Sequence, residues 1–137
     1  MIIVSACLAG VECRFDGRSK PNNMIMEMVE KGEAIPVCPE VLGGLPTPRD
    51  SQEIINGRVI TNNGRDVTNY FNKGAREVLR ICLENGCKRA ILKSKSPSCG
   101  MGYIGDGTFS GNLIEGDGVT ARLLKEHGIE VITEKDI

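Results

Sequence analysis

The feature that most constrains the fold is an alternation of short β-branched runs with segments of helical periodicity. Short runs rich in Ile and Val are typical of buried parallel strands, and apolar residues recurring every three or four positions are typical of amphipathic helices. This alternation predicts an α/β fold, a Rossmann-like three-layer domain with a mainly parallel sheet, over residues 1–137. A chain of 137 residues suits one domain, and it shows no linker or internal repeat. The predicted strands are 2–4, 34–38, 90–92 and 129–132.

Helices and one small hairpin insertion are predicted between these strands. The clearest helix begins at Asp66, a favourable N-cap, because the apolar residues after it keep helical spacing until Gly86. The pair Asn56-Gly57, flanked by β-branched residues, predicts a hairpin over 53–61, because Asn-Gly readily adopts the positive φ of a tight turn. The remaining predictions are helices over about 23–31 and 119–127, and loops over 39–52 and 94–118.

The charge balance and hydropathy pattern exclude several classes of protein. Seventeen Lys and Arg against eighteen Asp and Glu give a net charge of −1, which offers no basic surface for generic nucleic-acid binding. No apolar run approaches the roughly 18 residues of a membrane span. The first residues lack the charged leader of an export signal, so we expect a cytoplasmic protein without a membrane partner.

Six cysteines with a single histidine are the unusual part of the composition. Thiols stay reduced in the cytoplasm, which favours metal binding or thiol chemistry over disulfides. Cys7 follows the first predicted strand, Cys38 closes the second, and Cys99 lies in the loop after the third. Since parallel strands end at one edge of a sheet, these three thiols are predicted to gather there. Their spacing alone leaves two interpretations open, ligation of a cofactor or burial in the core.

The other cysteines have different contexts. Cys82 lies on the apolar stripe of the long predicted helix, so we expect it in the core. Cys87, just before the third strand, is expected there as well. Cys13 shares its stretch with turn-like residues, and the pattern does not decide its role.

Three further residues beside these thiols are candidates for proton transfer. Glu40 follows Cys38 by two positions and is either a solvated loop charge or a general base. Ser96 and Ser98 flank Pro97 next to Cys99, where serines are also common as turn formers.

Five motifs occur in order along the chain, namely SACLAG at 5–10, CRFDG at 13–17, CPEVLGGLPTPR at 38–49, GRDVT at 64–68 and SPSCG at 96–100. Together they resemble the DUF523 family, whose best understood members are thiouracil desulfidases. The resemblance covers the chain from Ser5 to the final strand. This chain has Ala9 where a second leucine is common, and we expect it to be without the further domain fused to some members.

The resemblance implies a [4Fe-4S] cluster bound by Cys7, Cys38 and Cys99, with one iron left without a protein ligand. It also implies Glu40 and a serine, Ser96 or Ser98, as catalytic partners. The implied reaction is a non-redox, hydrolytic desulfuration of a thiolated pyrimidine or related small thioamide that releases sulfide. Zinc or an empty site is expected in aerobic preparations.

A different class of function stays open at the level of the sequence. The same thiols would suit a non-catalytic iron–sulfur or zinc binding module that senses metal or transfers sulfur. Neither the exact thiolated substrate nor the oligomeric state follows from the sequence.

Overall fold

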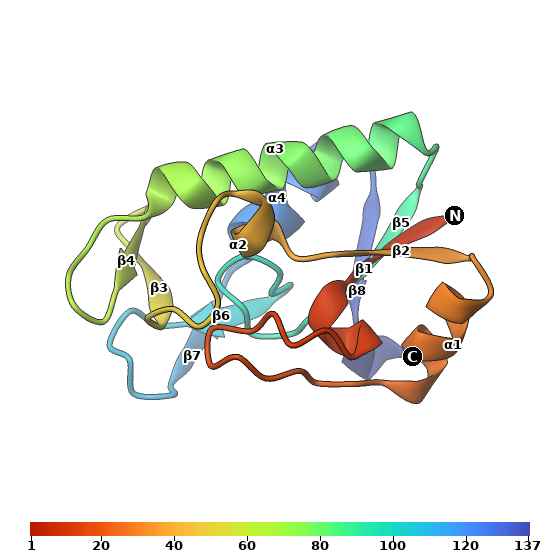
Figure 1. Cartoon of the computed structure of the whole chain (residues 1–137). Coiled ribbons are helices and arrows are strands. Elements are labelled where there is room, and N and C mark those ends of the chain that lie inside the picture. Colours follow the sequence, from red (N-terminus) through yellow and green to blue (C-terminus); the bar gives the residue numbers. More distant parts are fainter.

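The computed structural model describes residues 1–137 and is built around a four-stranded parallel sheet of order β2-β1-β5-β8 (Figure 1). All four predicted strands are confirmed, each within one residue of its predicted ends. The edge position of β2 explains its Pro36, because an edge strand tolerates a residue without an N–H group. The strands are β1 Ile2–Ser5, β2 Ala34–Val37, β5 Arg89–Leu92 and β8 Glu130–Thr133.

Helices cover both faces of the sheet, which confirms the predicted three-layer α/β fold. Helices α3 (Thr68–Glu84) and α4 (Val119–Glu126) lie together on one side, and α1 (Asn23–Glu30) lies on the other (Figure 1). Consecutive residues of a strand point to opposite faces, so the two central residues of β1 serve different cores. Ile3 packs in the cluster under α3 and α4, and Val4 packs in the cluster under α1.

The long helix α3 follows the predicted periodicity closely. Its fully buried residues, Phe71, Ala75, Val78 and Cys82, are spaced by three or four positions, which places them on one face. The N-cap is Val67 rather than the predicted Asp66, whose carboxylate lies one position further back and accepts a hydrogen bond from the N–H of Thr68 at 2.9 Å. The helix therefore begins two residues after the predicted start and ends at Glu84.

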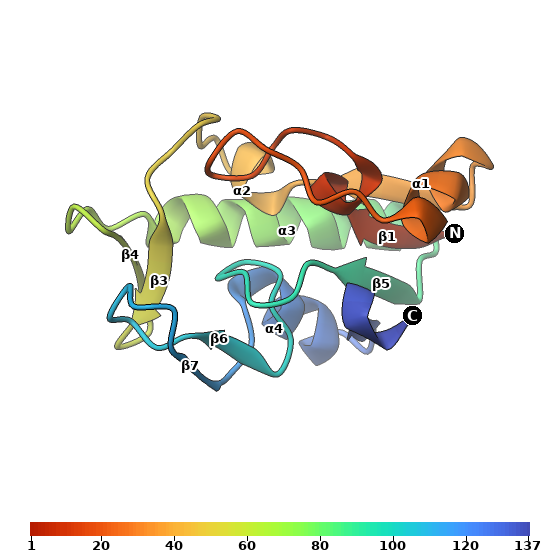
Figure 2. The ribbon, with the colours of Figure 1, turned by 90° about the horizontal axis from the view of Figure 1, so that it is seen from below.

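Two antiparallel hairpins lie side by side at the end of the molecule away from α1 (Figure 2). The first, β3 (Gln52–Ile55) and β4 (Arg58–Thr61), confirms the hairpin predicted from Asn56-Gly57, and both turn residues have positive φ. The second, β6 (Tyr103–Gly105) and β7 (Leu113–Glu115), falls within the predicted loop. Its strands have three residues each and β7 is fully exposed, so no alternation of apolar and polar residues marks them.

Two shorter helical elements were not predicted from the sequence, and the second of them lies in the loop predicted over 39–52. The 3₁₀ turn η1 (Ala6–Ala9) directly follows β1, and the one-turn helix α2 (Pro39–Leu42) directly follows β2. One turn is too short to show a helical period, and both elements carry candidate site residues. No helix in the structure is both long and apolar enough to span a bilayer.

Candidate active site

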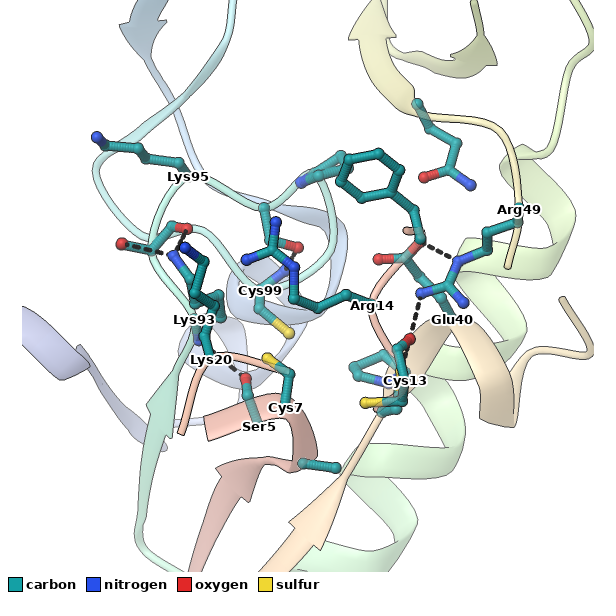
Figure 3. Close-up of a pocket in the computed structure, with 18 of the residues that line it drawn as sticks. Ser5, Cys7, Cys13, Arg14, Lys20, Glu40, Arg49, Lys93, Lys95 and Cys99 are labelled. Carbon is teal, nitrogen blue, oxygen red and sulfur yellow. Dashed lines mark hydrogen bonds and ion pairs between the residues drawn. The ribbon is translucent and has the colours of Figure 1, made fainter. Parts of the chain in front are cut away.

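A cavity of about 440 Å³ lies at the carboxyl edge of the parallel sheet (Figure 3). Residues at the carboxyl ends of three strands form part of its lining, namely 5–7 at the end of β1, 38–40 after β2 and 93–97 after β5. The loop around Arg14 and the segment leading into β3 complete the wall. This is the edge at which open parallel sheets bind ligands, and the cavity has the volume of a small-molecule site.

The three cysteines predicted to gather at this edge all line the cavity. Cys7 projects from η1, Cys38 stands between β2 and α2, and Cys99 belongs to the loop after β5. Figure 3 shows the thiols of Cys7 and Cys99 facing each other. The structure therefore brings together side chains that are more than thirty residues apart in the chain.

The surroundings give the three thiols different acidities. Burial raises the pKa of Cys7 to about 11 and that of Cys99 to about 12. Cys38 differs, because a hydrogen bond from the Cys13 thiol lowers the pKa of Cys38 to about 6, and the charge of Arg49 acts in the same direction. Cys38 is thus the most acidic of the three thiols, and Cys7 and Cys99 are less acidic than a free thiol.

Cys13 is a fourth thiol in the same cavity, and the sequence pattern did not place it. It is buried, and its backbone carbonyl accepts a hydrogen bond from Cys38 Sγ at 3.6 Å. The contact joins residues 25 positions apart, so no local pattern could have revealed it.

The remaining two cysteines lie outside the cavity. Cys82 on α3 is fully buried and Cys87 is 3% exposed, and both belong to the apolar cluster under α3 and α4. The predicted core role of both residues is confirmed.

Glu40 lies in the first turn of α2 and lines the cavity. Its side chain is 12% exposed, and its Oε1 accepts a hydrogen bond from Arg49 Nε at 2.9 Å. Burial raises the pKa of Glu40 above its usual value, against the opposing charge of Arg49. Glu40 is therefore a buried, paired carboxylate rather than a solvated loop charge.

Close packing of α2 on α3 fixes the position of Glu40. A side chain at Gly43 would collide with the carbonyl of Tyr70, and one at Gly74 would collide with the carbonyl of Pro39. The absence of a Cβ at both places lets the short helix lie directly against the long one. The long helix thus serves as the rigid support for the carboxylate.

The structure separates the two candidate serines. Ser96 lines the cavity, and its Oγ accepts hydrogen bonds from the N–H groups of Ser98 (3.1 Å) and Cys99 (3.0 Å). Ser98 is fully buried away from the cavity, with its hydroxyl 2.8 Å from Thr120 Oγ1 on α4. Ser98 therefore supports the loop, and only Ser96 faces the space in which a substrate could lie.

Positively charged side chains outnumber carboxylates in the lining, although the whole chain has a net charge of −1. Lys93 pairs with Glu134 at 3.2 Å, and Arg14 Nε, which has no hydrogen-bond partner, lies 3.5 Å from Asp16 Oδ1. This local excess suits a group that carries negative charge, and the overall composition concealed it. The cations are Arg14, Lys20, Arg49, Lys93 and Lys95, and the carboxylates are Glu40 and Glu53.

The fold and the cavity together define a class, namely α/β proteins with a thiol-lined cavity at the carboxyl edge of a parallel sheet. Within that class, the chain belongs to the 2-thiouracil desulfurase family, because the family model matches residues 2–136. The resemblance seen in the sequence motifs is thereby confirmed.

Two known proteins are similar to this chain over nearly its whole length. The uncharacterized protein YbbK of Bacillus subtilis (strain 168) is 44% identical over 147 aligned positions, which cover 100% of this chain and 97% of that relative. The solved structure of the [4Fe-4S]-dependent thiouracil desulfidase TudS (DUF523Vcz) is 46% identical and superposes with a TM-score of 0.95. That superposition covers 99% of this chain and 91% of the other.

Proposed function

We propose that this protein is a [4Fe-4S]-dependent desulfidase that replaces the sulfur of a thiolated pyrimidine, such as thiouracil, with oxygen. Membership in the 2-thiouracil desulfurase family and similarity to a [4Fe-4S]-dependent thiouracil desulfidase support the proposal. The observation that carries it is the cavity itself, where three thiols from distant segments share one lining with a buried carboxylate.

The donor set fits an iron–sulfur cluster. Thiolates are the usual protein ligands of such clusters, and we assign Cys7, Cys38 and Cys99 as the ligands. The excess of cations in the lining offsets the negative charge that three thiolates bring to a buried position. When bound, such a cluster supplies a Lewis-acidic iron without a protein ligand, which suits the soft sulfur of a thiocarbonyl.

The carboxylate of Glu40 has the position required of a general base. Its Oε1 is held by Arg49, while Oε2 has no protein partner and points into the cavity (Figure 3). We assign Oε2 the role of taking a proton from the water that attacks the thiocarbonyl carbon. The overall change is C=S plus water to C=O plus hydrogen sulfide, so protons move and no net electrons are transferred.

We assign Ser96, rather than Ser98, the role of a hydrogen-bond donor to the substrate. Its Oγ already accepts two backbone N–H groups, which leaves its own O–H free to donate into the cavity. A donor at this place orients the substrate or relays a proton, while the turn that carries Cys99 stays fixed.

The same observations support two broader assignments. Residues 1–137 form one domain, since the family match spans 2–136 and both faces of one sheet carry the main core clusters. All six cysteines are free thiols, which is typical of proteins in the reducing cytoplasm.

The test is sulfide release under anaerobic conditions. We expect protein reconstituted without oxygen to be brown, to contain about one [4Fe-4S] per chain, and to release sulfide from 2- or 4-thiouracil. Iron, acid-labile sulfide and the visible spectrum report the cluster independently of turnover. A colourless protein that binds stoichiometric zinc would contradict the assigned cofactor. An intact cluster without turnover on any thiolated base would favour a non-catalytic iron–sulfur module.

A further inference from the structure

Arg49 is the most thoroughly bonded side chain at the cavity, and the reaction outlined above gives it no role. Its side chain is only 4% exposed. The guanidinium donates four hydrogen bonds, of its five N–H groups, to protein oxygens. The acceptors are Glu40 Oε1 at 2.9 Å, Cys13 O at 2.9 Å, Pro46 O at 3.1 Å and Thr47 Oγ1 at 3.1 Å.

These bonds join three segments that the chain supplies separately. One acceptor lies on α2, one on the turn that carries Cys13, and two in the loop that precedes Arg49. The backbone N–H of Arg49 also donates to the carbonyl of Phe15 at 2.8 Å, so side chain and backbone hold the same turn. One residue therefore closes the wall between Cys13 and Glu40 (Figure 3).

The pairing with Arg49 has a specific consequence for Glu40. The guanidinium is the only protein group that bonds this carboxylate, and it takes Oε1 alone. The other oxygen, Oε2, has no protein partner, retains some exposure and points into the cavity (Figure 3). Rotation of the carboxylate away from Arg49 would leave a nearly buried charge unpaired, which is costly. The pairing thus keeps Oε2 directed at the substrate space.

We propose that Arg49 is a positioning residue of this active site, which orients Glu40 and locks it to the Cys13 turn. The proposal rests on the proposed function, in which Glu40 Oε2 handles the proton. Arginine suits this task better than lysine, because its rigid planar fork donates to several fixed acceptors at once. Lysine at this position would reach one acceptor and leave the others unpaired.

A double-mutant cycle between Arg49 and Glu40 tests the proposal. We expect Arg49→Gln to lower kcat by roughly 10- to 100-fold while KM changes by less than about threefold, because the loss lies in the catalytic step. In a Glu40→Gln background the same substitution should lower kcat by no more than about threefold, since no base is left for Arg49 to orient. If the double variant lowers kcat by the full product of the two single effects, the proposal is overturned, because Arg49 would then act independently of Glu40.

Two further variants keep the test decisive if Glu40→Gln has no measurable rate or Arg49→Gln folds poorly. Arg49→Lys should recover part of the activity lost in Arg49→Gln, because an ammonium can still bond Glu40 Oε1. Thr47→Val removes only one exposed acceptor of the guanidinium and should lower kcat by about two- to fivefold without lowering the unfolding temperature. Equal rates for Arg49→Lys and Arg49→Gln, or an unchanged kcat in Thr47→Val, would contradict a positioning role.

Iron content separates positioning from mere support of the fold. We expect all Arg49 and Thr47 variants to bind iron and acid-labile sulfide as the unsubstituted protein does. Loss of iron from Arg49→Gln and Arg49→Lys alike would overturn the proposal in favour of a structural role near Cys13 and Cys38. Failure of the proposed function looks different, since the unsubstituted, iron-loaded protein would then release no sulfide.

Discussion

Two regions of this molecule use the same residue type in opposite ways. Under α3 and α4, Cys82 and Cys87 pack among apolar side chains and have no polar role. At the carboxyl edge of the sheet, Cys7, Cys38 and Cys99 face a cavity lined by cations and a buried carboxylate. Burial alone does not distinguish the two sets, because Cys7 is 7% and Cys99 5% exposed. Under the proposed function, the position at the end of a parallel strand, rather than the residue type or its burial, separates the ligand thiols from the core thiols.

The largest expected effect comes from exchanging a thiol at the cavity edge. Replacing Cys38 by serine should abolish cluster uptake, because only two of the three assigned ligands, Cys7 and Cys99, then remain, while the fold is retained. Iron and acid-labile sulfide after anaerobic reconstitution measure this effect, and Cys7→Ser and Cys99→Ser should behave alike. Cys82→Ala is the matched control from the core and should bind iron normally. The contrast between the two regions fails if Cys82 or Cys87 is needed for iron and Cys38 is not.

The next largest effect concerns the carboxylate of the cavity region. Glu40→Gln keeps the shape and the acceptor for Arg49 but removes the base, so turnover should fall by roughly 10²-fold or more. The cluster should assemble as in the unsubstituted protein, which its visible spectrum would show. An undiminished rate with an intact cluster would mean that the proton is handled elsewhere.

A smaller effect separates the two serines of one turn. Ser96→Ala should lower turnover by roughly tenfold, less than the loss of the base, because its hydroxyl faces the substrate space. Ser98→Ala should instead lower the free energy of unfolding by about 1 kcal/mol, since its hydrogen bond with Thr120 is lost. Sulfide release and denaturant unfolding, measured on both variants, give the comparison. The reverse pattern would show that the turn presents Ser98 to the substrate.

The smallest effect lies in the core region and depends on pH. Cys82→Ala should cost about 1 kcal/mol of unfolding free energy at neutral pH. Burial raises the pKa of Cys82 in the folded protein to about 12, whereas a thiol in the unfolded chain ionises near pH 8.5 to 9. The unfolded state therefore loses its proton first as pH rises. The stabilising contribution of Cys82 is complete below about pH 8.5 and declines as the pH rises toward about 12. At pH 10 the loss is about 1.4 kcal/mol of unfolding free energy. Urea unfolding of both proteins between pH 7 and 10 measures the decline, and a constant difference would contradict it.

Much of the fold was predictable because its signals are local. Strand runs, the apolar stripe of α3 and the turn residues Asn56-Gly57 act through neighbours along the chain, and all were confirmed. The hairpin β6–β7 was not predicted, since three-residue exposed strands carry no periodicity. The helix α2 was not predicted either, because one turn is shorter than a helical period.

The candidate site divides in the same way. By itself, the sequence determined that Cys7, Cys38 and Cys99 share one edge, because each follows a strand and parallel strands end together. Its motifs also determined the family. Only the tertiary structure decided that Cys13 bonds Cys38, that Ser96 rather than Ser98 faces the cavity, and that Arg49 holds Glu40. These contacts depend on side-chain direction and on loops that meet across 25 or 36 positions. Sequence periodicity cannot predict such contacts, since only the packing of separate elements brings those atoms within hydrogen-bonding distance.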